Sequence, residues 1–167
     1  MSSQARSLGS QPSTYTVSLD GGFLARGFWI YVWEVRDLKG AVMLYVGRTG
    51  DSSSPNAQSP FNRMGQHLGF AKNSSMLRNH LKGRDVSPDH CSFRLVAHGP
   101  ILPEAEDWKT HVIRRDLAAA VEKQLAEDFV AAGYDVLNSV SSAKELDSEL
   151  YAPVHAAFAE EFDLSGR

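Results

Sequence analysis

The hydrophobic positions between residues 28 and 47 form two short runs that are typical of β-strands. Residues 28–35 read Phe-Trp-Ile-Tyr-Val-Trp-Glu-Val, and residues 41–47 read Ala-Val-Met-Leu-Tyr-Val-Gly. Both runs are rich in aromatic and β-branched residues, which favour strands. Asp-Leu-Lys-Gly at 37–40 supplies turn residues between them. The pattern predicts an antiparallel hairpin, followed by a long Ser-rich loop to about residue 59.

Helical spacing begins directly after this loop. Ser59 followed by Pro60 is typical of a helix start, and the apolar positions that follow predict a helix to about Gly69. A second short helix is predicted over residues 75–83. Alternation of apolar and polar residues over 91–97 then predicts a third strand.

Two longer helices are predicted in the second half of the chain. Apolar residues recur at four-residue steps from about residue 103 to Gly133, a natural helix stop. Ser142, with a glutamate three residues later, resembles a capping box and predicts a last helix to about residue 162, with Pro153 as a kink or break. The predicted fold class is α/β: a small, mainly antiparallel three-stranded sheet flanked by helices, with an added C-terminal helix.

Length and composition favour one globular domain in a chain of 167 residues, of which 43% are apolar and 22% are charged. We expect a flexible tail and lead-in over residues 1–26, the main domain over 27–139, and an acidic helical extension over 140–167. The Ser- and Gln-rich start lacks the apolar stretch of a secretory signal, no run is long enough to span a membrane, and the single Cys91 fits a reducing compartment. A cytoplasmic protein without membrane contact is therefore predicted.

The net charge of −3 hides a gradient along the chain. Residues 60–115 carry nine Lys and Arg against five Asp and Glu, whereas residues 116–167 carry three against eleven. Clustered cations neutralise nucleic-acid phosphates, so the basic segment predicts substrate contact through Lys72, Arg78, Lys82 and Arg84. The acidic end is interpreted as a solvated helical surface or as a surface that restrains or replaces nucleic-acid contact.

A few residues of the hairpin and helices combine the parts needed for phosphodiester hydrolysis. Tyr31 and Tyr45 lie on paired strands, where both phenols can project from one face. Arg63 and His67 are four residues apart, which places a guanidinium and an imidazole on one helical face. Glu122, on the long helix, is a suitable oxygen ligand for Mg²⁺, which keeps several waters and shares substrate phosphate oxygens. Each residue alone has a structural reading, so it is their joint order that points to catalysis.

This order resembles the GIY-YIG nuclease superfamily from about Gly27 to Ser139. The resemblance is carried by Ile30-Tyr31, Tyr45-Val46-Gly47-Arg48-Thr49, Arg63 with His67, Glu122, and Leu137-Asn138. Three features depart from the family pattern: Trp29 replaces the first glycine, Val46 replaces isoleucine, and the loop over residues 50–58 is long. None of these departures removes a reactive group.

The resemblance implies a metal-dependent endonuclease with Mg²⁺ or Mn²⁺ held by Glu122, and it favours DNA over RNA. It also implies that Tyr31 or Tyr45 is the general base, that His67 assists proton movement, and that Asn138 holds the loop or a phosphate. Arg63 would clamp phosphate oxygens, and Arg48 is a further cation for substrate or phenolate.

Two other functions stay open, namely a nucleic-acid-binding module without turnover and a protein-interaction domain that uses the acidic C-terminal helix. A homodimer or a protein partner also stays open.

Overall fold

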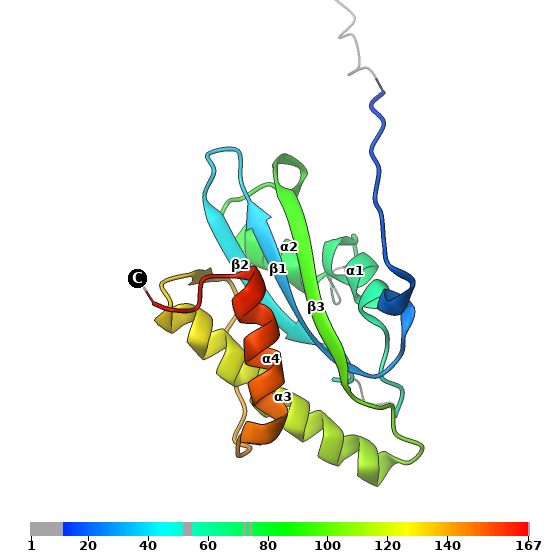
Figure 1. Cartoon of the computed structure of the whole chain (residues 1–167). Helices are drawn as coiled ribbons and strands as arrows, with labels where there is room; N and C mark the ends of the chain where they lie inside the picture. Colours follow the sequence, from blue (N-terminus) through cyan, green and yellow to red (C-terminus); the bar gives the residue numbers. More distant parts are fainter. Residues whose placement is uncertain (1–11, 52–54, 72, 74, 167) are drawn as a thin grey trace, which may run out of the picture.

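Strand β1 (Phe28–Arg36) is the centre of the sheet and coincides with the first strand-like run of the sequence. It pairs antiparallel on one side with β2 (Val42–Arg48) and on the other with β3 (Ser92–Leu102). A two-residue strand, β4 (Asp135–Val136), pairs in parallel with β2. The strand order is therefore β3-β1-β2-β4 (Figure 1). This computed structural model describes residues 12–51, 55–71, 73 and 75–166.

The α/β class is confirmed, and two details of the predicted sheet are corrected. Within the described residues the sheet has four strands rather than three, because the short parallel strand β4 joins its edge. Strand β3 also continues to Leu102, beyond the predicted end at Ala97. Pro100 is accommodated there because β3 is an edge strand whose register with β1 shifts between Phe28 and Ile30.

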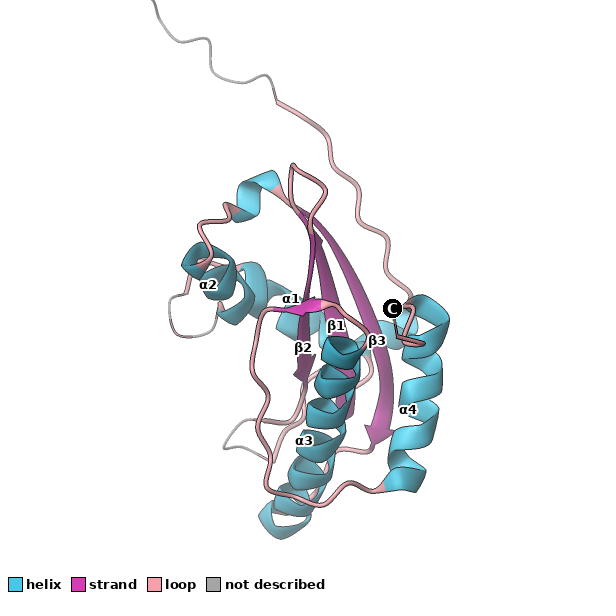
Figure 2. Ribbon diagram, turned by 90° about the vertical axis from the view of Figure 1, so that its left-hand side faces the viewer, coloured by secondary structure: helices cyan, strands magenta, loops and turns pink. Residues whose placement is uncertain are grey.

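Four α-helices lie in the described part of the chain, two on each face of the sheet. Helices α1 (Pro60–Leu68) and α2 (Met76–Gly83) cover one face, and both match the predicted spans to within a residue. Helices α3 (Trp108–Ala131) and α4 (Ser148–Glu161) cover the other face. Figure 2 shows α4 on the opposite side of the strands from α1 and α2. None of the helices in this part of the chain has the length and apolar composition to cross a lipid bilayer.

Both long helices begin later than the sequence pattern predicts, because aspartates cap them. The Asp107 side chain accepts a hydrogen bond from the Thr110 amide at 2.9 Å and sets the start of α3. The Asp147 side chain accepts bonds from the amides of Glu149 and Leu150, so α4 starts at Ser148 and not after Ser142. Pro153 lies inside α4 and does not break it.

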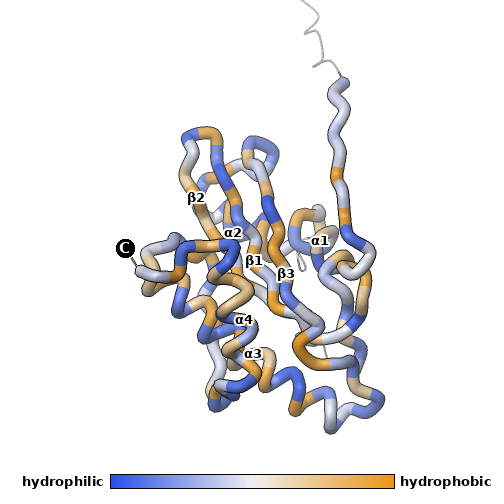
Figure 3. The backbone as a smooth tube through the Cα atoms, in the orientation of Figure 1, coloured by the Kyte–Doolittle hydropathy of each residue, from blue (hydrophilic) through white to orange (hydrophobic). Residues whose placement is uncertain are grey.

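Two hydrophobic cores lie on the two faces of the sheet, and Figure 3 shows hydrophobic positions along the strands that form them. The first core joins the sheet to α3 and α4 and includes Val154 and Phe158. Residues from the predicted extension over 140–167 thus pack into the same core as the main domain. The second core joins the opposite face to α1 and α2.

The described residues before the sheet form an exposed lead-in and one short helix. Residues 12–20 are exposed and lead into a short 3-10 helix, Gly21–Leu24. The first eleven residues of the predicted flexible tail lie outside the described residues. A second 3-10 helix, Pro88–His90, precedes β3.

Candidate active site

The hairpin brings Tyr31 and Tyr45 to the same face of the sheet, as the strand pattern predicts. Tyr31 pairs with Gly47, and Tyr45 pairs with Trp33 two residues along. The Tyr31 ring lies across Gly47 so closely that a Cβ at that position would stand 2.5 to 2.6 Å from the ring atoms. Glycine is therefore required at 47 for Tyr31 to hold this position.

Helix α1 supplies a histidine and an arginine to the Tyr31 hydroxyl. His67 Nε2 lies 2.6 Å from the hydroxyl oxygen, and the His67 ring is only 1% exposed. Arg63 Nε donates to the same oxygen at 3.5 Å. The His67 ring also packs edge-on to the Tyr45 ring, with centroids 5.0 Å apart. The predicted i, i+4 pair thus converges on both tyrosines from one helical face.

Asp51, in the loop after β2, holds the guanidinium of Arg63. Its carboxylate accepts from Arg63 Nη2 at 3.2 Å. The loop is anchored by the buried Thr49, whose hydroxyl accepts from the Trp29 amide at 2.9 Å and donates to the Gly27 carbonyl. Asp51 was not among the residues predicted for the site, because the Ser-rich loop around it has no period that places a side chain.

Glu122 approaches from the other face of the sheet, where α3 packs. Arg48 follows Gly47 at the end of β2 and faces α3, because side chains alternate along a strand. Its Nη1 donates to Glu122 Oε2 in an ion pair, and Glu122 is 7% exposed. Arg48, predicted to bind substrate, therefore already has an anionic partner within the chain.

Electrostatic coupling joins the two sides of this cluster. Burial, reinforced by the negative charge of Glu122, raises the pKa of Tyr45 to about 12. Burial, opposed by Arg63, raises the pKa of Tyr31 further above its ordinary value. Burial and the positive charge of Arg63 lower the pKa of His67 to about 4. Both phenols are thus protonated and the imidazole is neutral at neutral pH, so the proton between Tyr31 and His67 rests on the tyrosine oxygen.

The donor chemistry of Glu122 fits a hard cation held by few protein ligands. No group of three or more His, Cys, Asp or Glu that could hold a metal gathers among the described residues. Burial, opposed by Arg48, raises the pKa of Glu122, and an approaching cation would favour its charged form. One carboxylate with waters and substrate oxygens is the arrangement that Mg²⁺ commonly accepts. Glu122 is therefore the residue that would hold Mg²⁺ or Mn²⁺.

The residues predicted to contact phosphates have varied surroundings. Lys82 is exposed on α2. Arg84 makes an exposed ion pair with Asp135, with oxygens at 2.8 and 2.9 Å. Arg78 donates to the Leu68 carbonyl at 3.0 Å, and its guanidinium lies 4.4 Å from the centre of the Phe70 ring. Lys72 lies outside the described residues.

Asn138 and His80 complete the surroundings of Tyr45. Asn138 accepts from the Val46 amide at 3.0 Å and donates to the Val46 carbonyl at 2.7 Å, so its amide holds the segment after β4 against β2. Of the two predicted roles, this geometry supports holding the loop, and binding a phosphate stays a prediction. The His80 ring on α2 lies 5.7 Å from the Tyr45 ring, a contact that the sequence pattern does not predict.

Comparisons of the chain with family models, curated proteins and solved structures found no match.

Proposed function

We propose that the chain is a metal-dependent endonuclease of the GIY-YIG type that hydrolyses phosphodiester bonds, with DNA as the favoured substrate. One observation carries the proposal. The Tyr31 hydroxyl is contacted by both His67 and Arg63, residues that are more than thirty positions away in sequence. A tyrosine that only packs in a core does not need a buried imidazole and a guanidinium on its hydroxyl. Phosphodiester hydrolysis uses such groups.

Tyr31 and His67 would handle the proton of the attacking water. As the water oxygen bonds to phosphorus, its proton passes to a base, the ester P–O bond breaks, and the leaving oxygen takes up a proton. The neutral His67 ring, 2.6 Å from the Tyr31 hydroxyl, would accept its hydrogen bond, and the positive charge of Arg63 favours the ionised phenol, whose oxygen would take the proton of the water. This direct link favours Tyr31 over Tyr45 as the base.

Arg63 would stabilise the charge that develops on the phosphoryl oxygens. Its Nη2 is held by Asp51 and its Nε points at Tyr31, so the guanidinium is preorganised beside the base. A guanidinium stays charged throughout the reaction and matches phosphate oxygens. A divalent ion on Glu122, when bound, would supply further charge stabilisation and lower the pKa of bound water.

The charge distribution supports a nucleic acid more than a protein partner. Several acidic side chains of the C-terminal segment are paired inside the chain: Asp135 with Arg84, Glu161 with Arg94, and Asp116 with Lys144. These pairs reduce the negative charge available to a partner on that surface. Helix α2 meanwhile presents Lys82 on the same side of the sheet as Tyr31.

The test is incubation of the purified chain with supercoiled plasmid and with single-stranded DNA, in Mg²⁺, in Mn²⁺ and in chelator. We expect cleavage with metal and none with chelator. Arg63→Ala should lose cleavage, whereas Arg36→Ala, which removes an exposed arginine outside the cluster, should retain it. Salt-sensitive binding without cleavage would instead support the binding module. Neither binding nor cleavage would support the protein-interaction domain.

A further inference from the structure

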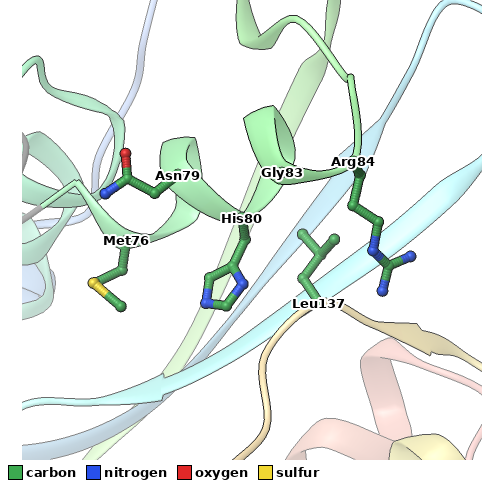
Figure 4. A pocket seen from close by; sticks show the side chains of 6 residues that line it. All are labelled: Met76, Asn79, His80, Gly83, Arg84 and Leu137. Carbon is green, nitrogen blue, oxygen red and sulfur yellow. The ribbon is translucent and has the colours of Figure 1, made fainter.

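A cavity of about 390 Å³ opens on helix α2 (Figure 4). Five of its lining residues lie on one face of α2 or at its end, at the spacing of successive helical turns. The sixth comes from the segment after β4 and faces α2 across the cavity. The lining residues are Met76, Asn79, His80, Gly83, Arg84 and Leu137.

The His80 side chain, which lines this cavity, is linked through ring contacts to the residues around the Tyr31 hydroxyl. The His80 ring contacts the Tyr45 ring, with centroids 5.7 Å apart, and the Tyr45 ring contacts the His67 ring at 5.0 Å. His67 in turn reaches the Tyr31 hydroxyl. A ligand group in the cavity is therefore separated from the proposed base by two ring-to-ring contacts.

The cavity is preformed, because hydrogen bonds hold the side opposite the helix. The Leu137 amide donates to the Leu44 carbonyl at 2.7 Å, and the neighbouring Asn138 is bonded to Val46 through both ends of its amide. At the rim, Asp135 holds Arg84 in a two-oxygen ion pair. Few side chains would therefore need ordering when a ligand enters.

The lining suits a flat heterocycle that has a phosphate beside it. Met76 and Leu137 supply apolar and polarisable contact, and His80 supplies a flat ring. Burial and the positive charge of Arg84 lower the pKa of His80, so this ring is neutral at neutral pH and suited to stacking. Arg84 lines the cavity and Lys82 is exposed on the same helix, so both are cations that can attract a phosphate.

We propose that this cavity binds the unstacked base of a nucleotide that flanks the phosphate cleaved at the Tyr31 cluster. The assignment of that phosphate rests on the proposed nuclease function, whereas the binding of a base rests on the cavity itself. Turning a base out of the stack is less costly in single-stranded, mismatched or distorted DNA than in a regular duplex. The cavity therefore selects DNA in which one base beside the cut is unpaired.

The proposal is tested by titrating the full chain, in chelator, with a 5′-phosphorylated deoxydinucleotide and with its two analogues that lack one base. NMR signals of the His80 imidazole report the site directly. These signals should shift with the dinucleotide, and one of the two base-free analogues should bind about tenfold more weakly, since a stacked base contributes that much or more.

Two variants fill the cavity and should abolish this preference for a base. Met76→Trp places an indole at a position that is 43% exposed, and Gly83→Leu adds a side chain where a Cβ would meet no atom within 4 Å. Leu38→Trp adds the same indole in the exposed hairpin turn and should keep the preference.

The proposal is overturned if the His80 signals do not move, if all three ligands bind equally, or if both filled variants retain the preference. The titration needs neither metal nor turnover, so it is independent of the nuclease assay. A chain that shows the preference but cuts no DNA would keep the base site and refute the nuclease. A chain that cuts DNA but shows no preference for a base would keep the nuclease and refute the base site.

Discussion

The two faces of the sheet bury different kinds of side chain. The face covered by α3 and α4 packs aliphatic and aromatic residues such as Ile30, Leu44 and Phe129 against one another. The face covered by α1 and α2 buries Tyr31 and His67 among its apolar residues. Buried polar groups cost free energy unless they are paired, and His67 Nδ1 has no partner among the described residues. We infer that the first face mainly supplies stability, whereas the second also holds the polar groups of the proposed site.

Helix α3 contributes residues both to the apolar core and to the candidate site. Its Leu125 and Phe129 are fully buried in the apolar core, while Glu122 reaches Arg48 at the end of β2. The candidate metal ligand is thus held by the packing of the face covered by α3, whereas the tyrosines that it would act with in the proposed site lie on the other face.

The largest effect on stability is expected from Phe129→Ala on the apolar face. The Phe129 ring contacts Tyr134, Phe158 and Phe162, so its loss leaves a cavity and should lower the free energy of unfolding by about 3 to 5 kcal/mol. Urea unfolding measures this, with the exposed Val130→Ala as the control, for which a change within about 0.5 kcal/mol is expected. A loss below 1 kcal/mol for Phe129→Ala would remove the proposed contrast between the faces.

Tyr31→Phe should have the opposite effects, namely a smaller loss of stability and a large loss of cleavage. The ring stays over Gly47, so the free energy of unfolding should fall by only about 1 to 3 kcal/mol, the cost of leaving the buried His67 Nε2 without its partner. Cleavage should fall by about 100-fold or more, because the proposed base is lost. Tyr151→Phe removes a hydroxyl that donates to Asp128 outside the cluster, and it should retain activity. Equal cleavage by both variants would exclude Tyr31 as the base.

These contrasts also show what the sequence can predict about the fold. Strands β1 and β2 were predicted from apolar runs bounded by turn residues, and helices α1 and α2 from apolar positions at helical spacing. Strand β4 was missed, since two residues show no period and pair only when the chain returns to β2. For the starts of α3 and α4, Asp107 and Asp147 competed with other cap signals nearby, and only packing decides between such caps.

The sequence predicts a site residue where the period of its strand or helix fixes the direction of the side chain. Alternation along the strands and the i, i+4 spacing on α1 place Tyr31, Tyr45 and His67 on facing surfaces. Asp51 depends on how a loop without period closes, and the Arg48–Glu122 pair forms between elements 74 positions apart. These contacts arise from tertiary packing, for which a single sequence carries no local signal.

The stability of the second face should depend on pH through His67. Burial lowers the folded-state pKa of His67 to about 4, below its ordinary value of 6.5. The neutral His67 therefore makes its full contribution to the free energy of unfolding above about pH 6.5. This contribution is lost as the pH falls toward 4, because the unfolded state binds the proton more readily than the folded state. Between pH 7.5 and 4.5 this amounts to about 2 to 3 kcal/mol. Urea unfolding of His67→Gln should lack this part of the loss, and an identical pH dependence in both proteins would contradict the assignment.

The smallest effect is expected from Lys82→Ala on α2. Losing one phosphate contact should reduce the slope of log affinity against log salt by about one for duplex DNA, with little dependence on base sequence. The stability of the protein should change by less than about 0.5 kcal/mol, since Lys82 is exposed. Lys39→Ala, in the exposed hairpin turn, is the matched control and should leave the slope unchanged. If the two variants behave alike, DNA lies on another surface.

Cleavage by Glu122→Gln in Mg²⁺ at saturating DNA tests the central claim most directly, namely that residues from both faces of the sheet form one metal-dependent active site. Glutamine retains the size of the side chain and an oxygen for Arg48 but removes the anionic metal ligand. The rate should fall by about 100-fold to 1,000-fold, while DNA binding measured in chelator is retained. Glu127→Gln, an exposed change on the same helix, should cleave like wild type. Cleavage by Glu122→Gln at a rate near that of wild type would contradict the proposed metal site and the account built on it.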